Sequence, residues 1–159
     1  MKAVAKLFKD IGMKENAGNS LTNFEVNVKV KLAFLWTSLM FLYIYADYFQ
    51  LMAPKQLESM INLQTPMGPA TPRLLVSFSI LLIVPALMIA LCIFLRPLVN
   101  KWMNIIVAIL YAIISILIII SDIGSEWQTF LVLYNVVELF VFAAIIWQAV
   151  KWPRTILAG

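Results

Sequence analysis

Two acidic residues, Asp47 and Glu138, stand inside long apolar stretches of this sequence. An ionisable side chain in the hydrocarbon of a bilayer costs about 2.5–3.5 kcal/mol on insertion scales, so each should face neighbouring helices or a water-filled cavity. At about 1.5 Å per helical residue, Asp47 would lie roughly 6 Å below the outer end of its helix, whereas Glu138 would lie near the middle of its own. These two carboxyl groups are the main candidates for function.

Polar residues recur at helical spacing around both acids. Intervals of three and four residues place side chains on one face of a helix. Such faces are formed by Trp36, Met40, Tyr43, Asp47 and Gln50, by Asn104, Ala108, Tyr111, Ser115 and Asp122, and by Gln128, Leu131, Asn135 and Glu138. We predict that these faces enclose an outward-opening polar pocket with a carboxyl group at its floor. Its expected ligand-binding residues are Tyr43, Asp47, Tyr111, Asn135 and Glu138.

The elements that position these residues are predicted to span a membrane. Of the 159 residues, 63% are hydrophobic and 13% are charged, whereas a soluble domain has about 45–50% apolar and about 25% charged residues. Four apolar stretches, at about residues 32–51, 74–95, 102–121 and 127–150, are long enough to cross a hydrocarbon core of about 30 Å as helices. They predict an all-α fold, an antiparallel four-helix transmembrane bundle over residues 30–152, followed by a cytoplasmic tail at 153–159.

Residues 1–29 are predicted to form a short cytoplasmic amphipathic helix and a linker. Val4, Leu7, Phe8 and Ile11 fall at helical spacing, with lysines on the opposite side. Such a helix can lie at the interface of an anionic inner leaflet. The alternative is a frayed, solvated N-terminus.

Basic residues collect on one side of the predicted bundle. They are Lys29, Lys31, Arg96, Lys101, Lys151 and Arg154. Because basic residues favour the cytoplasmic side, we predict a multi-pass protein of the cytoplasmic (inner) membrane with both termini in the cytoplasm. The net charge of +4 then reflects orientation, and we expect no nucleic-acid partner. Tryptophans gather on the same side, as in an interfacial aromatic belt: Trp36, Trp102, Trp147 and Trp152.

Two residue counts exclude whole chemistries. The sequence has no histidine, which excludes histidine-ligated metals and haem and histidine acid–base catalysis. Its one cysteine, Cys92, cannot form an intramolecular disulfide. No nucleophile motif, phosphate-binding loop or set of metal ligands is visible either. We therefore expect no metal and no cofactor, and a non-enzymatic role is favoured.

The polar residues also have a purely structural interpretation. Glu138 is then protonated and hydrogen bonded to Tyr111 or Asn135, and Asp47 forms an ion pair with a nearby basic residue. Pro85 predicts a kink in the second helix, with a freed backbone carbonyl that a neighbouring helix satisfies.

One run is unusual for a membrane helix because it places an acid among three tyrosines. It reads Tyr-Ile-Tyr-Ala-Asp-Tyr-Phe at residues 43–49, and Trp152-Pro153-Arg154 closes the fourth stretch. In these features the chain resembles, from about Phe24 onward, a family of small four-helix membrane proteins of bacteria and archaea that has no assigned activity. The resemblance implies the four-helix topology and no catalytic residue.

Three functions fit these features. The first is binding or transport of a small cationic or lipophilic solute, since a carboxyl group among tyrosines attracts organic cations. The second is a non-enzymatic accessory or assembly subunit of a membrane complex. The third is a lipid-modifying enzyme in which Asp47 and Glu138 form an acid–base pair. The expected partners are the lipid bilayer, a small ligand and, for transport, further copies of the chain in a homo-oligomer.

Overall fold

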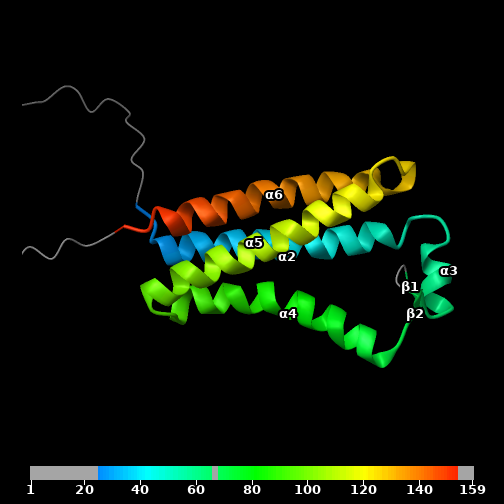
Figure 1. Cartoon of the computed structure of the whole chain (residues 1–159), viewed down its shortest axis with the longest axis horizontal. Coiled ribbons are helices and arrows are strands. Elements are labelled where there is room, and N and C mark those ends of the chain that lie inside the picture. The colour runs from blue at the N-terminus through cyan, green and yellow to red at the C-terminus, as the bar shows by residue number, and fades with distance from the viewer. Residues whose placement is uncertain (1–24, 66–67, 154–159) are drawn as a thin grey trace, which may run out of the picture.

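The computed structural model of the chain describes residues 25–65 and 68–153. Within these ranges the long elements are α2 (Val28–Gln50), α4 (Pro72–Phe94), α5 (Pro97–Asp122) and α6 (Thr129–Val150), which run alternately in opposite directions (Figure 1). Each is long and apolar enough to cross a membrane. The predicted all-α four-helix fold is confirmed, and the chain is compatible with a multi-pass membrane protein. The expected N-terminal amphipathic helix lies outside the described residues.

Short elements connect the helices at one end of the bundle. α3 (Gln56–Ile61) follows α2, β1 (Gln64–Thr65) pairs antiparallel with β2 (Gly68–Pro69), and η1 (Glu126–Gln128) precedes α6. We call this end the α3 end. The start of α2, the end of α6 and the turn from α4 to α5 lie at the opposite end, which we call the terminal end (Figure 1).

The helix boundaries follow from capping residues in the sequence. The Asn27 side chain accepts a hydrogen bond from the backbone N–H of Lys29 at 2.9 Å, and the Thr71 hydroxyl accepts one from Leu74 at 3.2 Å. Such side chains satisfy N–H groups that the first helical turn leaves unpaired. Proline opens both α4 and α5, at a position where no helical hydrogen bond needs its N–H. Gly124 takes a φ of 95° in the turn after α5, which glycine adopts without steric cost.

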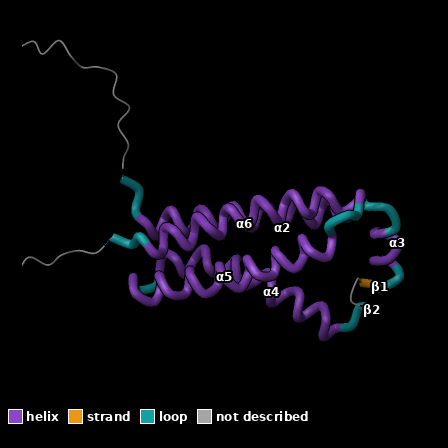
Figure 2. The backbone as a smooth tube through the Cα atoms, turned by 45° about the horizontal axis from the view of Figure 1, so that its top comes forward, coloured by secondary structure: helices purple, strands orange, loops and turns teal. Residues whose placement is uncertain are grey.

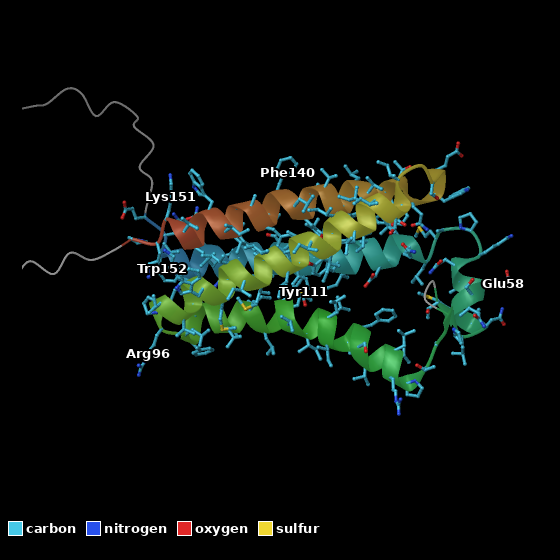
Figure 3. All side chains as sticks on the ribbon, in the orientation of Figure 1. Glu58, Arg96, Tyr111, Phe140, Lys151 and Trp152 are labelled. Atoms are coloured by element: carbon cyan, nitrogen blue, oxygen red, sulfur yellow. The ribbon has the colours of Figure 1, made fainter. Side chains whose placement is uncertain are left out.

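The packed core lies in the half of the bundle nearer the terminal end. Trp36 and Phe142 are buried, and their rings meet edge to face with 6.2 Å between centroids. The other buried apolar side chains of this core include Leu32, Leu39, Met88, Cys92 and Ile145. The outward faces carry large apolar side chains (Figure 3), of which Phe140 is 73% exposed. Apolar exposure on this scale suits contact with lipid.

The helices do not pack evenly along the bundle. α5 packs along α6, and α2 packs against both α4 and α6, whereas α4 makes few contacts with α5. α4 contains Pro85 in its interior, and its N-terminal half turns away from α5 toward the α3 end (Figure 2). A bend in this place is what an interior proline predicts. The half of the bundle nearer the α3 end is therefore the more open one.

Candidate functional site

A cavity of about 760 Å³ lies in the half of the bundle nearer the α3 end. All four long helices contribute to its lining, together with Gln56 of α3 and Gln128 of η1. Its volume falls in the range of about 300–1,000 Å³ that is usual for small-molecule sites. The cavity exists because α4 diverges from α5, so that the side chains of these two helices do not close the space between them.

All five site residues predicted from the sequence line this cavity. They are Tyr43 and Asp47 of α2, Tyr111 of α5, and Asn135 and Glu138 of α6. The helical faces that contain them therefore converge, as their spacing predicts. The same faces add Gln50, Ser115, Asp122, Gln128 and Leu131 to the lining. Their members nearer the terminal end are buried in the core instead: Trp36, Asn104 and Ala108.

Glu138 lies deep in the cavity and is 4% exposed. Its Oε2 accepts a hydrogen bond from the Ser115 hydroxyl at 2.9 Å, which joins α6 to α5. The prediction that Glu138 is hydrogen bonded to Tyr111 or Asn135 is wrong, because these two side chains donate to backbone carbonyls instead. A carboxyl group has two oxygens and accepts several hydrogen bonds, so Glu138 keeps accepting capacity for a ligand.

Tyr111 connects α5 to the bend of α4. Pro85 has no N–H, so the carbonyl of Leu81, four residues earlier, lacks its helical partner. The Tyr111 hydroxyl donates to this carbonyl at 2.6 Å. The prediction that a neighbouring helix satisfies the freed carbonyl is confirmed. Because Leu81 also lines the cavity, this bond helps to position one of the cavity walls.

Two side-chain oxygens on the lining are buried and have no hydrogen-bond partner in the described part of the chain: Asn135 Oδ1 and Gln128 Oε1. The amide nitrogen of Asn135 donates to the Leu131 carbonyl at 2.9 Å, which leaves the amide oxygen as the atom without a partner. An unsatisfied buried acceptor costs about 1–3 kcal/mol. Both oxygens therefore favour a ligand that donates hydrogen bonds.

The lining of the cavity is acidic. It includes the carboxyl groups of Asp47, Asp122 and Glu138, and no lysine or arginine of the described ranges belongs to it. Asp47 is exposed, and the described residues contain no ion pair between it and the nearby basic residues Lys55 and Arg73. A cleft lined by charges of one sign concentrates counter-ions. Where these carboxyl groups are ionised, such a lining attracts cations.

A second polar cluster lies in the core toward the terminal end. The Trp36 indole N–H donates to Asn104 Oδ1 at 2.7 Å, and the Asn104 amide donates to Asn100 Oδ1 at 2.6 Å. Asn100 in turn donates to the Cys92 carbonyl. All four residues are fully buried, so the cluster joins α2, α4 and α5 in a structural role. The expectation that Trp36 belongs to an interfacial belt is wrong, because its N–H is used inside the core.

Basic side chains contact helix C-termini at the terminal end. Lys29 Nζ donates to the carbonyls of Leu95 at 2.7 Å and Ile93 at 3.0 Å, where α4 ends. Lys101 Nζ donates to the Val150 carbonyl at 3.3 Å, where α6 ends. Cations are favoured at a helix C-terminus because the unpaired carbonyls make it the negative end of the helix dipole. Lys29 and Lys101, two of the basic residues that predict the orientation in the membrane, thus also stabilise the fold.

The α4 wall is the part of the site that the sequence does not reveal. Phe78, Leu81 and Leu82 line the cavity, but apolar residues surround α4 on all sides, so no polar stripe marks its inner face. Ser115 and Asp122 did carry a signal, since both continue the helical face of Tyr111. The predicted site does not include them, because it is centred on the two acids inside the apolar stretches.

Comparison with protein families assigns the chain to one of them. The model of a family of unknown function (DUF6326) matches residues 20–159, so the chain belongs to this family. The resemblance to a family without assigned activity is thereby confirmed. No curated protein and no solved structure matches the chain.

Proposed function

We propose that this family member binds a small organic cation in the cavity at the α3 end. The observation that carries the proposal is the lining, which combines carboxyl groups and unpaired amide oxygens without a basic side chain from the described residues. Apolar surroundings strengthen the attraction between a carboxylate and a cation. The rings of Tyr43 and Tyr111 offer further attraction of about 0.5–2 kcal/mol when a cation lies over an aromatic face.

Binding has more support than transport. Residues at the α3 end, such as Gln56 and Gln128, belong to the cavity lining, so a solute would reach the cavity from this end. Carrying it across the membrane would require a second opening at the terminal end. The packed core around Trp36 and the hydrogen-bonded Asn104 occupy that route. The conformation therefore supports a site that is accessible from one side.

We further propose that the α3 end faces away from the cytoplasm. Arg96 and Lys151 lie at the terminal end, and Glu58 of α3 lies at the opposite one (Figure 3). Lys29 and Lys101 also lie at the terminal end, through their contacts with the ends of α4 and α6. Basic residues favour the cytoplasmic side of a membrane. In this orientation the cavity takes its ligand from outside.

The test compares three probes of equal length and different charge: heptylamine, heptanol and heptanoate. Thermal unfolding of the full chain is followed in phosphatidylcholine nanodiscs with each probe. A ligand at about 100 times its Kd stabilises the folded state by about 2.7 kcal/mol, so heptylamine should raise Tm and the other two should not. Equal effects of heptylamine and heptanol would reject the proposal.

Two variants make the test specific for the cavity. Glu138→Gln keeps a side chain that can accept from Ser115 but removes the deep carboxyl group, so most of the response to heptylamine should disappear. Glu58→Gln removes an exposed acid of α3 that does not line the cavity, and its response should match that of the wild type. A full response in Glu138→Gln would contradict a cation site in the cavity.

A further inference from the structure

We propose that the cation is a linear aliphatic diamine, whose two ammonium groups occupy two polar levels of the cavity about 10 Å apart along the bundle. The inference rests on the proposed function and names the substrate class of the same site. The inner level is formed by Ser115, Asn135 and Glu138. The outer level, at the α3 end, is formed by Asp122 and Gln128.

Two neighbouring helices give the same separation between the levels. Gln128, which immediately precedes α6, and Asn135 of α6 are seven residues apart, and so are Asp122 and Ser115 at the end of α5. Seven helical residues extend about 10 Å and make almost two turns, so both members of a pair lie on one face. All four residues line the cavity. The two levels are therefore a property of both helices rather than of one side chain.

Each level combines a carboxyl group with an unpaired amide oxygen. The inner level has Glu138 and Asn135 Oδ1, on a side chain that is only 5% exposed, and the outer level has Asp122 and Gln128 Oε1. A protonated primary amine carries one positive charge and three N–H donors. One such group satisfies a carboxyl group and an amide oxygen together, whereas a quaternary ammonium group would leave the amide oxygen unpaired.

The walls of the cavity include apolar side chains that a methylene chain can contact. Leu131 of α6 lies between Gln128 and Asn135 in the chain, and Leu81 and Leu82 of α4 line the same cavity from the opposite wall. A methylene chain meets such walls without leaving a polar group unsatisfied. A diamine with an aliphatic spacer therefore fits both levels and these apolar walls, while a monoamine fills one level only.

The experiment compares heptamethylenediamine with heptylamine and with trimethylenediamine. The first has an extended nitrogen-to-nitrogen distance that matches the separation of about 10 Å. Heptylamine has the same chain and one ammonium group, and trimethylenediamine is too short to reach both levels. Kd values are measured by titration calorimetry on the full chain in phosphatidylcholine nanodiscs. Heptamethylenediamine should bind about ten-fold or more tightly than either of the others, because only it makes charged hydrogen bonds at both levels.

Variants of the outer level test where the second ammonium group binds. Asp122→Asn combined with Gln128→Leu should lower the affinity for heptamethylenediamine to that for heptylamine measured on the same variant, because only the inner level is left to hold an ammonium group. Asp122→Asn alone is a more conservative variant, to be used if the double variant does not fold. It should reduce, but not abolish, the ratio by which heptamethylenediamine binds more tightly than heptylamine. Glu126→Gln removes an acid of the same turn that does not line the cavity, and it should keep the full advantage.

The outcomes separate this inference from the proposed function. Suppose that heptylamine binds and that Glu138→Gln weakens its binding, but that heptamethylenediamine binds no more tightly than heptylamine. The two-level assignment is then overturned, and the cation site stands. The two-level assignment is also overturned if the outer-level variants leave the diamine advantage intact. If none of the amines binds, the proposed function fails, and the diamine assignment fails with it.

Discussion

The hydroxyl of Tyr111 donates a hydrogen bond to the carbonyl oxygen of Leu81 at 2.6 Å. This carbonyl is the one that Pro85 leaves without a partner in α4. One side chain of α5 thus compensates for a defect in α4, the helix whose N-terminal half turns away from α5 (Figure 2). Since Leu81 and Tyr111 both line the cavity, the bond links the shape of α4 to the shape of the candidate site.

Removing this hydrogen bond should destabilise the protein only while Pro85 is present. Tyr111→Phe should lower the free energy of unfolding by about 1 kcal/mol, because the Leu81 carbonyl loses its donor in an apolar environment. In a Pro85→Ala background, the restored backbone N–H at position 85 can pair with this carbonyl, so the same change should cost much less. A double-mutant cycle from denaturant unfolding measures the difference. Additive costs would contradict the link between the two residues.

The two carboxyl groups predicted from the sequence should respond differently to salt. Asp47 is exposed whereas Glu138 is buried, and the Debye length falls from about 30 Å at 0.01 M to about 3 Å at 1 M ionic strength. Asp47→Asn should therefore weaken heptylamine binding at low salt and have little effect at high salt, while Glu138→Gln should weaken it at both. Kd values at the two ionic strengths check this. A strong effect of Asp47→Asn at high salt would place Asp47 in direct contact with the ligand.

Lys29 should stabilise the fold through the C-terminus of α4. Lys29→Met removes the donor to the carbonyls of Ile93 and Leu95 and should lower the free energy of unfolding by about 0.3–1 kcal/mol. Lys31→Met removes an equal charge two residues later, from a side chain with no described hydrogen bond, and should cost less. Equal losses in the two variants would show that net charge, and not the contact with α4, is responsible.

The proposed orientation predicts which exposed positions a membrane-impermeant maleimide reaches in intact cells. Glu58→Cys, at the α3 end, should be labelled from outside, whereas Arg96→Cys, at the terminal end, should be labelled only after the cells are opened. Both native residues are exposed. The wild type is the background control, since its one thiol, Cys92, is buried. The reverse labelling pattern would invert the orientation and give the cavity access to the cytoplasm.

Much of the fold and of the candidate site was predictable because the relevant signals are local. The length of an apolar run depends only on consecutive residues, and it located all four long helices. Helical periodicity is set by the backbone geometry of 3.6 residues per turn, so spacing alone placed Tyr43 and Asp47 on one face, and Asn135 and Glu138 on another. Pro85 likewise predicted a backbone carbonyl without its helical partner, because proline itself lacks the N–H group.

What only the tertiary structure decided is which groups meet. Glu138 finds Ser115, which is 23 residues away in the chain, and the Leu81 carbonyl finds Tyr111 at a separation of 30 residues. Trp36 is buried against Asn104, 68 residues away, instead of lying in an interfacial belt. These pairs depend on how far each helix is rotated and bent relative to its neighbours. A sequence periodicity defines the face of a helix but not the partner of that face, because the partner is selected by packing among helices that are distant in the chain.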